Sequence, residues 1–101
     1  VSETLIYDFD TGSVEKPYHE VLEKLNTMTF TEGLQDFTPT DHMIFEEENR
    51  GRLFIFNEAG EVIATFVNKA TNGEIYRMGW SRYILQAHGE RALEAIARSG
   101  C

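Results

Sequence analysis

The chain has a single cysteine, Cys101 at its last position, so an intrachain disulfide is excluded. Small secreted domains are often stabilised by disulfides, and this composition favours a reducing, cytoplasmic environment. We interpret Cys101 as an exposed thiol. No apolar run approaches the roughly 18 residues of a membrane-spanning helix, and residues 1–10 do not resemble a secretory signal. We therefore expect a soluble cytoplasmic protein without membrane contact.

Basic residues are also scarce, with 9 Lys and Arg against 17 Asp and Glu and a net charge of −8. Proteins that bind nucleic acids or anionic membranes usually need a basic surface to neutralise phosphates. The charge balance argues against both as direct partners and is compatible with a basic protein partner. With 101 residues, we expect residues 1–101 to form a single compact domain.

Motifs for catalysis and for cofactors are missing. His19, His42 and His88 are isolated and show no spacing typical of zinc ligands. The chain contains no Gly-x-Ser-x-Gly motif and no glycine-rich phosphate-binding loop. The sequence therefore predicts no metal, no cofactor and no enzymatic function.

The apolar patterning predicts a sheet with a helix near each end of the chain. Residues 4–9 are β-prone and predict a first strand, and apolar residues at spacings of three and four predict a helix over 17–27. Residues 29–41 are expected to form a loop. Residues 42–47, 52–57, 61–68 and 74–80 predict further strands, with a hairpin at Glu58-Ala59-Gly60. A last helix follows Ser81 as its N-cap and is expected to be kinked or split at Gly89. The predicted fold class is α+β: a three- to four-stranded, mainly antiparallel meander with the N-terminal and C-terminal helices packed on it.

Two carboxylates stand at the end of the first predicted strand, in Tyr7-Asp8-Phe9-Asp10-Thr11. This segment resembles the phosphatase motif of the haloacid dehalogenase family, which implies Asp8 as a nucleophile and Asp10 as an acid/base beside magnesium. The chain departs from the family because Thr11 replaces the usual glycine, no downstream acidic pair follows, and the length is too short for a doubly wound fold. The alternative interpretation is that Asp8 and Asp10 lead into a turn and hydrogen-bond to nearby backbone.

An acidic stretch forms the first candidate contact surface. We expect its carboxylates to be solvated, and they do not follow the pattern of a calcium loop. The residues are Glu46, Glu47, Glu48, Glu58 and Glu61.

The second candidate contact surface combines aromatic and arginine side chains, which are enriched at protein–protein interfaces. It runs against the charge of the chain, because residues 62–83 carry +2 while residues 32–61 carry −6. The alternative interpretation places Tyr76, Met78 and Trp80 in the core under a helix. The candidate residues are Tyr76, Arg77, Trp80, Arg82 and Tyr83.

These observations favour a small, acidic, non-catalytic protein-interaction module, an inhibitor or adaptor that binds a larger protein. Its partner would have either a basic surface or a surface that accepts aromatic side chains. A basic partner surface would bind the acidic stretch as it would bind a nucleic acid. Strong salt sensitivity of binding would favour the acidic surface, and loss of binding in Trp80→Ala would favour the aromatic one. Two alternatives stay open: a small magnesium-dependent hydrolase using Asp8 and Asp10, and a homo-oligomer subunit that pairs along the apolar hairpin of residues 52–68.

Overall fold

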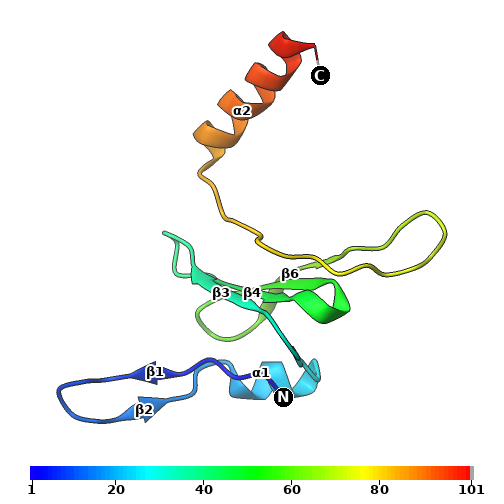
Figure 1. Cartoon of the computed structure of the whole chain (residues 1–101). Helices are drawn as coiled ribbons and strands as arrows, with labels where there is room; N and C mark the ends of the chain where they lie inside the picture. The colour runs from blue at the N-terminus through cyan, green and yellow to red at the C-terminus, as the bar shows by residue number, and fades with distance from the viewer. Residues whose placement is uncertain (101) are drawn as a thin grey trace.

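A four-stranded antiparallel sheet forms the centre of the molecule in the computed structural model, which describes residues 1–100 and leaves Cys101 outside the described residues (Figure 1). Neighbours along the chain are also neighbours in the sheet, so the predicted meander is confirmed. The strands are β3 (Leu34–Phe37), β4 (Met43–Glu47), β5 (Arg52–Phe56) and β6 (Val62–Val67). The remaining elements are β1 (Ile6–Tyr7), β2 (Val14–Glu15), α1 (His19–Lys24), a 3-10 turn (Glu48–Arg50) and α2 (Gln86–Ser99).

Glycine fixes the turn between β4 and β5. Gly51 has φ 60°, a conformation that side chains rarely adopt, and a Cβ atom there would lie 2.1 Å from the carbonyl oxygen of Tyr76. The turn therefore brings the segment after β6 against the β4–β5 connection.

The hydrophobic core lies between α1 and one face of the sheet. Alternate residues of β4 and β5 point to this face, and directly opposed pairs such as Met43 with Phe56 share it. Leu22 of α1 is fully buried against them, and Tyr18 stacks on Phe56 with ring centroids 5.6 Å apart. The buried apolar cluster comprises Leu22, Met43, Phe45, Phe54 and Phe56.

The N-terminal part differs from its prediction. Helix α1 has only six residues, because Tyr18 at its N-cap and Asn26 after its end have φ of 66° and 48°, outside helical geometry. The first strand is shortened to β1, which pairs with β2 rather than with the central sheet.

Two central predictions were also wrong. The expected loop at 29–41 contains β3, which pairs with β4. The expected strand at 74–80 does not form beyond one bridge between Lys69 and Ile75. Two backbone bonds flank this bridge, from Tyr76 to Asn68 and from Ala70 to Glu74. The side-chain amide of Asn68 also donates to the carbonyls of Tyr76 and Arg77.

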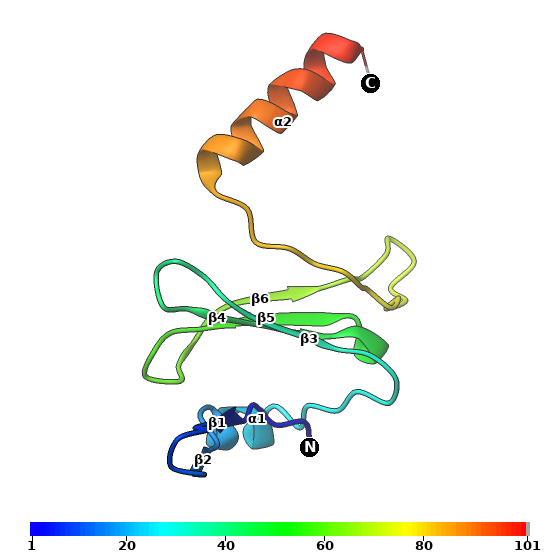
Figure 2. The same cartoon turned by 60° about the vertical axis from the view of Figure 1, so that its left-hand side comes forward.

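Helix α2 does not pack on the sheet, contrary to the prediction. It is continuous through Gly89, begins after Leu85 rather than Ser81, and has no buried residue. Figures 1 and 2 show α2 projecting on the side of the sheet opposite α1. The radius of gyration is 16.1 Å, whereas a compact chain of this length would have about 13 Å. None of the helices among residues 1–100 combines the length and apolarity needed to cross a membrane.

Candidate functional site

Two of the glutamates expected on the acidic surface are buried. Glu46 is 2% exposed and Glu47 is fully buried, so the prediction of solvated carboxylates was wrong for both. As neighbours in β4 they point to opposite faces of the sheet. Each has a separate set of partners.

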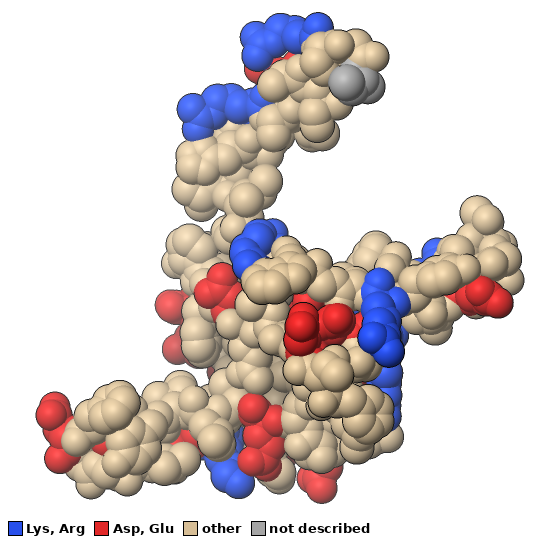
Figure 3. Space-filling view, viewed as in Figure 1, with Lys and Arg blue, Asp and Glu red and all other residues tan. Residues whose placement is uncertain are grey.

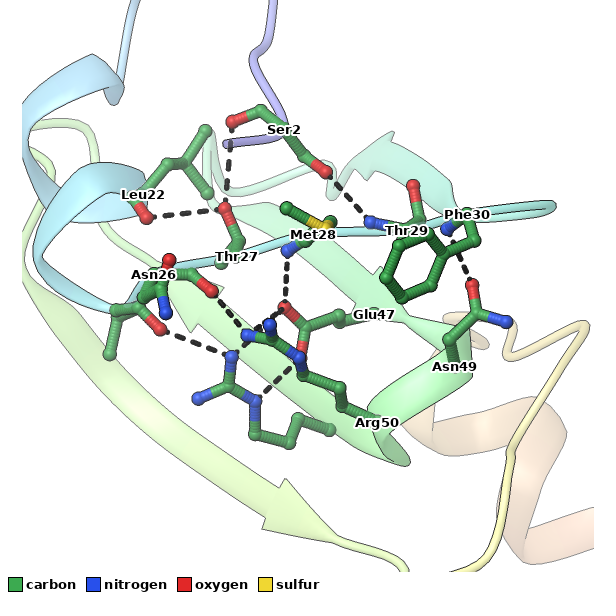
Figure 4. Close-up of polar contacts among 12 residues, drawn as sticks. Ser2, Leu22, Asn26, Thr27, Met28, Thr29, Phe30, Glu47, Asn49 and Arg50 are labelled. Carbon is green, nitrogen blue, oxygen red and sulfur yellow. Dashed lines mark hydrogen bonds and ion pairs between the residues drawn. The ribbon is translucent and has the colours of Figure 1, made fainter.

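Glu47 lies on the α1 side and joins three chain segments (Figure 4). Its carboxylate accepts two hydrogen bonds from Arg52, from Nε at 2.6 Å and from Nη2 at 2.9 Å. It also accepts the backbone N–H of Met28 at 2.7 Å, and Nη1 of Arg50 lies 3.8 Å away. The same arginines donate to carbonyls at the end of α1, Arg52 to Leu25 and Arg50 to Asn26. The buried charge is therefore satisfied and ties α1 to the sheet.

Glu46 lies on the opposite face and anchors residues 77–85, which we call the arm. Its Oε2 accepts the backbone N–H of Ser81 at 2.8 Å. A second anchor forms where the Met78 N–H donates to the Glu48 carbonyl at 3.3 Å. These two bonds hold the first half of the arm against the end of β4 and the 3-10 turn that follows it.

The arm, the end of β4 and the chain leading into β3 line an open pocket of about 340 Å³, which we call the Trp80 pocket. The indole of Trp80 is 76% exposed at its rim, and the guanidinium carbon of Arg82 lies 5.4 Å from the centroid of that ring. Figure 3 shows basic and acidic side chains side by side over the central sheet. The lining residues are Thr31, Glu32, Gly33, Leu34, Glu46, Glu48, Trp80 and Arg82.

The carboxylates of the pocket repel one another. Burial raises the pKa of the Glu48 carboxyl above its usual value, and the charges of Glu32 and Glu46 raise it further, while Arg77 acts in the opposite direction. The pocket therefore has an excess of negative charge that a cation would relieve.

The predicted site residues are only partly brought together. Trp80, Arg82, Glu46 and Glu48 line one pocket, whereas Tyr76 and Tyr83 are exposed but do not line it. The Tyr76 hydroxyl instead donates to Glu74.

Glu58 and Glu61 lie elsewhere, at the β5–β6 turn, where they line an open hollow of about 1010 Å³ together with Tyr18. Burial, followed by the Glu58 charge, raises the pKa of the Tyr18 hydroxyl. The acidic stretch is therefore divided between two places on the molecule.

The prediction missed the contribution of the first residue of β3, and of the two residues before it, to the pocket. Glu32, Gly33 and Leu34 come from the region expected to be a loop. They reach the arm through the β3–β4 register, in which Leu34 pairs with Glu46. No short-range pattern in the sequence carries that pairing.

Asp8 and Asp10 lie in the exposed turn between β1 and β2. Asp8 Oδ1 accepts the backbone N–H of Asp10 at 2.8 Å and that of Thr11 at 3.2 Å. These hydrogen bonds lower the pKa of the Asp8 carboxyl, the Asp10 N–H having the largest effect. The geometry matches the interpretation that Asp8 shapes a turn.

Within residues 1–100, no group of three or more His, Cys, Asp or Glu side chains is arranged to hold a metal ion. Comparisons of the chain with protein-family models, curated proteins and solved structures find no match.

Proposed function

We propose that the chain is a non-catalytic protein-interaction module, an inhibitor or adaptor, that binds a larger protein through the Trp80 pocket. The observation that carries the proposal is an indole, 76% exposed, at the rim of an acidic cavity. Exposed tryptophan next to arginine is typical of residues that contribute most to protein–protein binding. The single cysteine, which excludes an intrachain disulfide, supports a cytoplasmic location for this module.

The backbone at Trp80 supports a role in contact. Its φ of 62° is unusual for a bulky residue and costs about 1–3 kcal/mol. The adjoining bonds from Ser81 to Glu46 and from Met78 to Glu48 hold the chain in this conformation. This backbone strain holds the Trp80 side chain in solvent, where it does not stabilise the fold. Backbone strain of this kind is concentrated at functional sites, which supports a role for Trp80 in binding.

The pocket best fits a basic side chain of the partner. Lysine or arginine would relieve the repulsion around Glu48, and its aliphatic stem and charge would fit beside an indole ring. The volume of about 340 Å³ is at the lower end of ligand pockets, which suits one side chain with its neighbouring backbone. Burial of Glu46 and Glu47 removes two carboxylates from the continuous acidic surface that a nucleic-acid mimic would need.

Selection from a random peptide display library tests the proposal. Enriched peptides should contain Lys or Arg, and they should bind Trp80→Ala and Glu48→Gln at least about tenfold more weakly than the unchanged chain. Glu58→Gln is the matched control, because Glu58 is acidic but lies outside the pocket. Added salt should weaken binding. Peptides that bind Trp80→Ala as tightly as the unchanged chain would refute the proposal.

A further inference from the structure

Helix α2 and one face of the sheet are apolar surfaces that no other part of residues 1–100 covers. The helix has no buried residue, with Leu93 69% and Ile96 51% exposed. A helix of 14 residues is only marginally stable alone in water. Its stability must therefore come from packing against another surface.

The sequence of α2 is arranged for such packing. At about 100° per residue, Gly89, Ala92, Leu93 and Ile96 fall within an arc of about 100°. The four charged residues of the helix fall within an equal arc on the opposite side: Glu90, Arg91, Glu94 and Arg98. In Figure 3, the basic side chains gather along one side of α2.

The second surface is the part of the sheet over β5 and β6 that faces away from α1. Leu53 pairs with Phe66, and Ile55 pairs with Ala64, so all four share this face. Phe66 is 53% exposed, and Leu53 and Ile55 are half-buried. Helix α2 is about 21 Å long and β6 about 20 Å, so the helix matches the length of this face.

The charges of the two parts of the chain are complementary. Residues 1–76 contain 15 acidic and 5 basic residues and carry −10. Residues 77–101 contain 2 acidic and 4 basic residues and carry +2. Contact between the C-terminal part and the sheet body is therefore favoured electrostatically.

The total exposed surface indicates the size of the missing contact. The chain exposes 7317 Å², whereas a folded monomer of 11.6 kDa exposes about 5,800 Å². The difference of about 1,500 Å² is nearly twice the roughly 800 Å² that each partner buries in a standard interface. A two-fold dimer has two helix-to-sheet contacts, and each chain supplies its helix to one of them and its sheet to the other. Both surfaces of each chain would then be covered, which would bury part of this excess area.

We propose that α2 of one chain packs on the β5–β6 face of a second copy, and that the exchange is reciprocal in a two-fold symmetric dimer. The conformation of the arm favours docking of α2 on a second copy over docking on its own sheet. The last hydrogen bond that holds the arm to Glu46 or Glu48 is at Ser81, and Leu85 just before α2 is extended with ψ 144°. The arm therefore directs α2 away from its own sheet (Figure 2). Exchange of an identical element is a low-cost route to a closed dimer. This proposal does not depend on the Trp80 pocket.

A complementation experiment tests the exchange by measuring mass in solution with light scattering. The unchanged chain should have twice the 11.6 kDa mass at micromolar to submillimolar concentration. The double variant Leu93→Glu/Ile96→Glu disables the helix, and Phe66→Glu disables the sheet face. Each alone should raise the dimer dissociation constant at least about 100-fold, because a charge would be buried in an apolar contact. Circular dichroism should show that each variant is folded.

Mixing the two variants should restore a dimer, because the intact α2 of the Phe66→Glu chain can dock on the intact sheet of the helix variant. Ala87→Glu, on the charged side of α2, and Thr65→Glu, on the other face of β6, should remain dimeric as matched controls. A monomeric unchanged chain would overturn the proposal and indicate that α2 folds back. A dimeric helix variant would overturn it in favour of edge pairing through β6. A dimeric Phe66→Glu chain would overturn it in favour of contact between the α2 helices.

Discussion

Substitution of Glu47 by glutamine should destabilise the fold severely, although it removes only one charge and no volume. The carboxylate is fully buried and receives two hydrogen bonds from Arg52 and one from Met28. Removing one partner of a buried ion pair costs about 3–5 kcal/mol. Arg52 is 24% exposed and keeps its bond to Leu25, so the lower end applies, about 3 kcal/mol.

A loss of about 3 kcal/mol is a large part of the 5–15 kcal/mol that stabilises a domain, and it should lower Tm by about 12–24 °C. Urea denaturation followed by circular dichroism measures the change, since Trp80 is too exposed to report unfolding well by fluorescence. Glu58→Gln, at an exposed position, should change the free energy of unfolding by less than about 0.5 kcal/mol.

A double-mutant cycle identifies the ion pair as the cause. Glu47→Leu combined with Arg52→Leu should cost about 2 kcal/mol less than the sum of the two single variants, because neither charge is left buried alone. If Glu47→Gln costs less than about 1 kcal/mol, or the two single effects simply add, the carboxylate does not join α1 to the sheet as described.

Three further predictions concern single side chains. Thr4→Val should raise Tm by about 4–8 °C, because the Thr4 hydroxyl is buried without a hydrogen-bond partner. Thr27→Val should lower Tm, because the Thr27 hydroxyl donates to the Leu22 carbonyl. Calorimetry that shows a change of the same sign for both variants would contradict this reasoning. The pKa of Glu48 is higher in the folded chain than in the unfolded chain. The stabilisation linked to its protonation is therefore fully present below the pKa of the unfolded chain and is lost as the pH rises through the pKa of the folded chain. Glu48→Gln should raise Tm near pH 7 and leave it unchanged below about pH 4. The pKa of Asp8 is lowered in the folded chain, so its effect on stability depends on pH in the opposite direction: the β1–β2 turn should loosen as the pH falls through that pKa. Asp8→Ala should speed amide hydrogen exchange at Asp10 and Thr11 already at neutral pH, because both backbone N–H groups donate to Asp8.

The meander was predictable because its turns are local. Asn49-Arg50-Gly51 and Glu58-Ala59-Gly60 mark the two hairpins of β4, β5 and β6, and glycine at φ 60° and 81° closes each of them. The same local reasoning failed at β3, where a strand of four residues depends on its pairing with β4.

The buried glutamates show where composition misleads. Three consecutive glutamates indicate a solvated surface, yet Glu47 continues the alternation of Met43 and Phe45 on the core face. That alternation was a usable signal. The partners that make burial tolerable, Arg52 and the backbone of Met28, are defined only by the fold.

The amphipathic pattern of α2 correctly indicated a helix but not what it contacts. Apolar residues at helical spacing predict that a face will be buried and do not identify the surface that buries it. The position of Trp80 was undecidable for a related reason, because its exposure depends on a positive φ and on the hydrogen bond of Ser81 to Glu46.

The proposal that this chain acts by binding another protein is tested most directly by quantitative affinity capture from a lysate of the source organism, with mass spectrometry of the bound proteins. The unchanged chain and Glu58→Gln should each retain one larger protein in stoichiometric amount, and Trp80→Ala should lose it. Equal retention by Trp80→Ala and the unchanged chain would show that the pocket is not the contact. Recovery of the chain alone in every case would contradict the proposal itself.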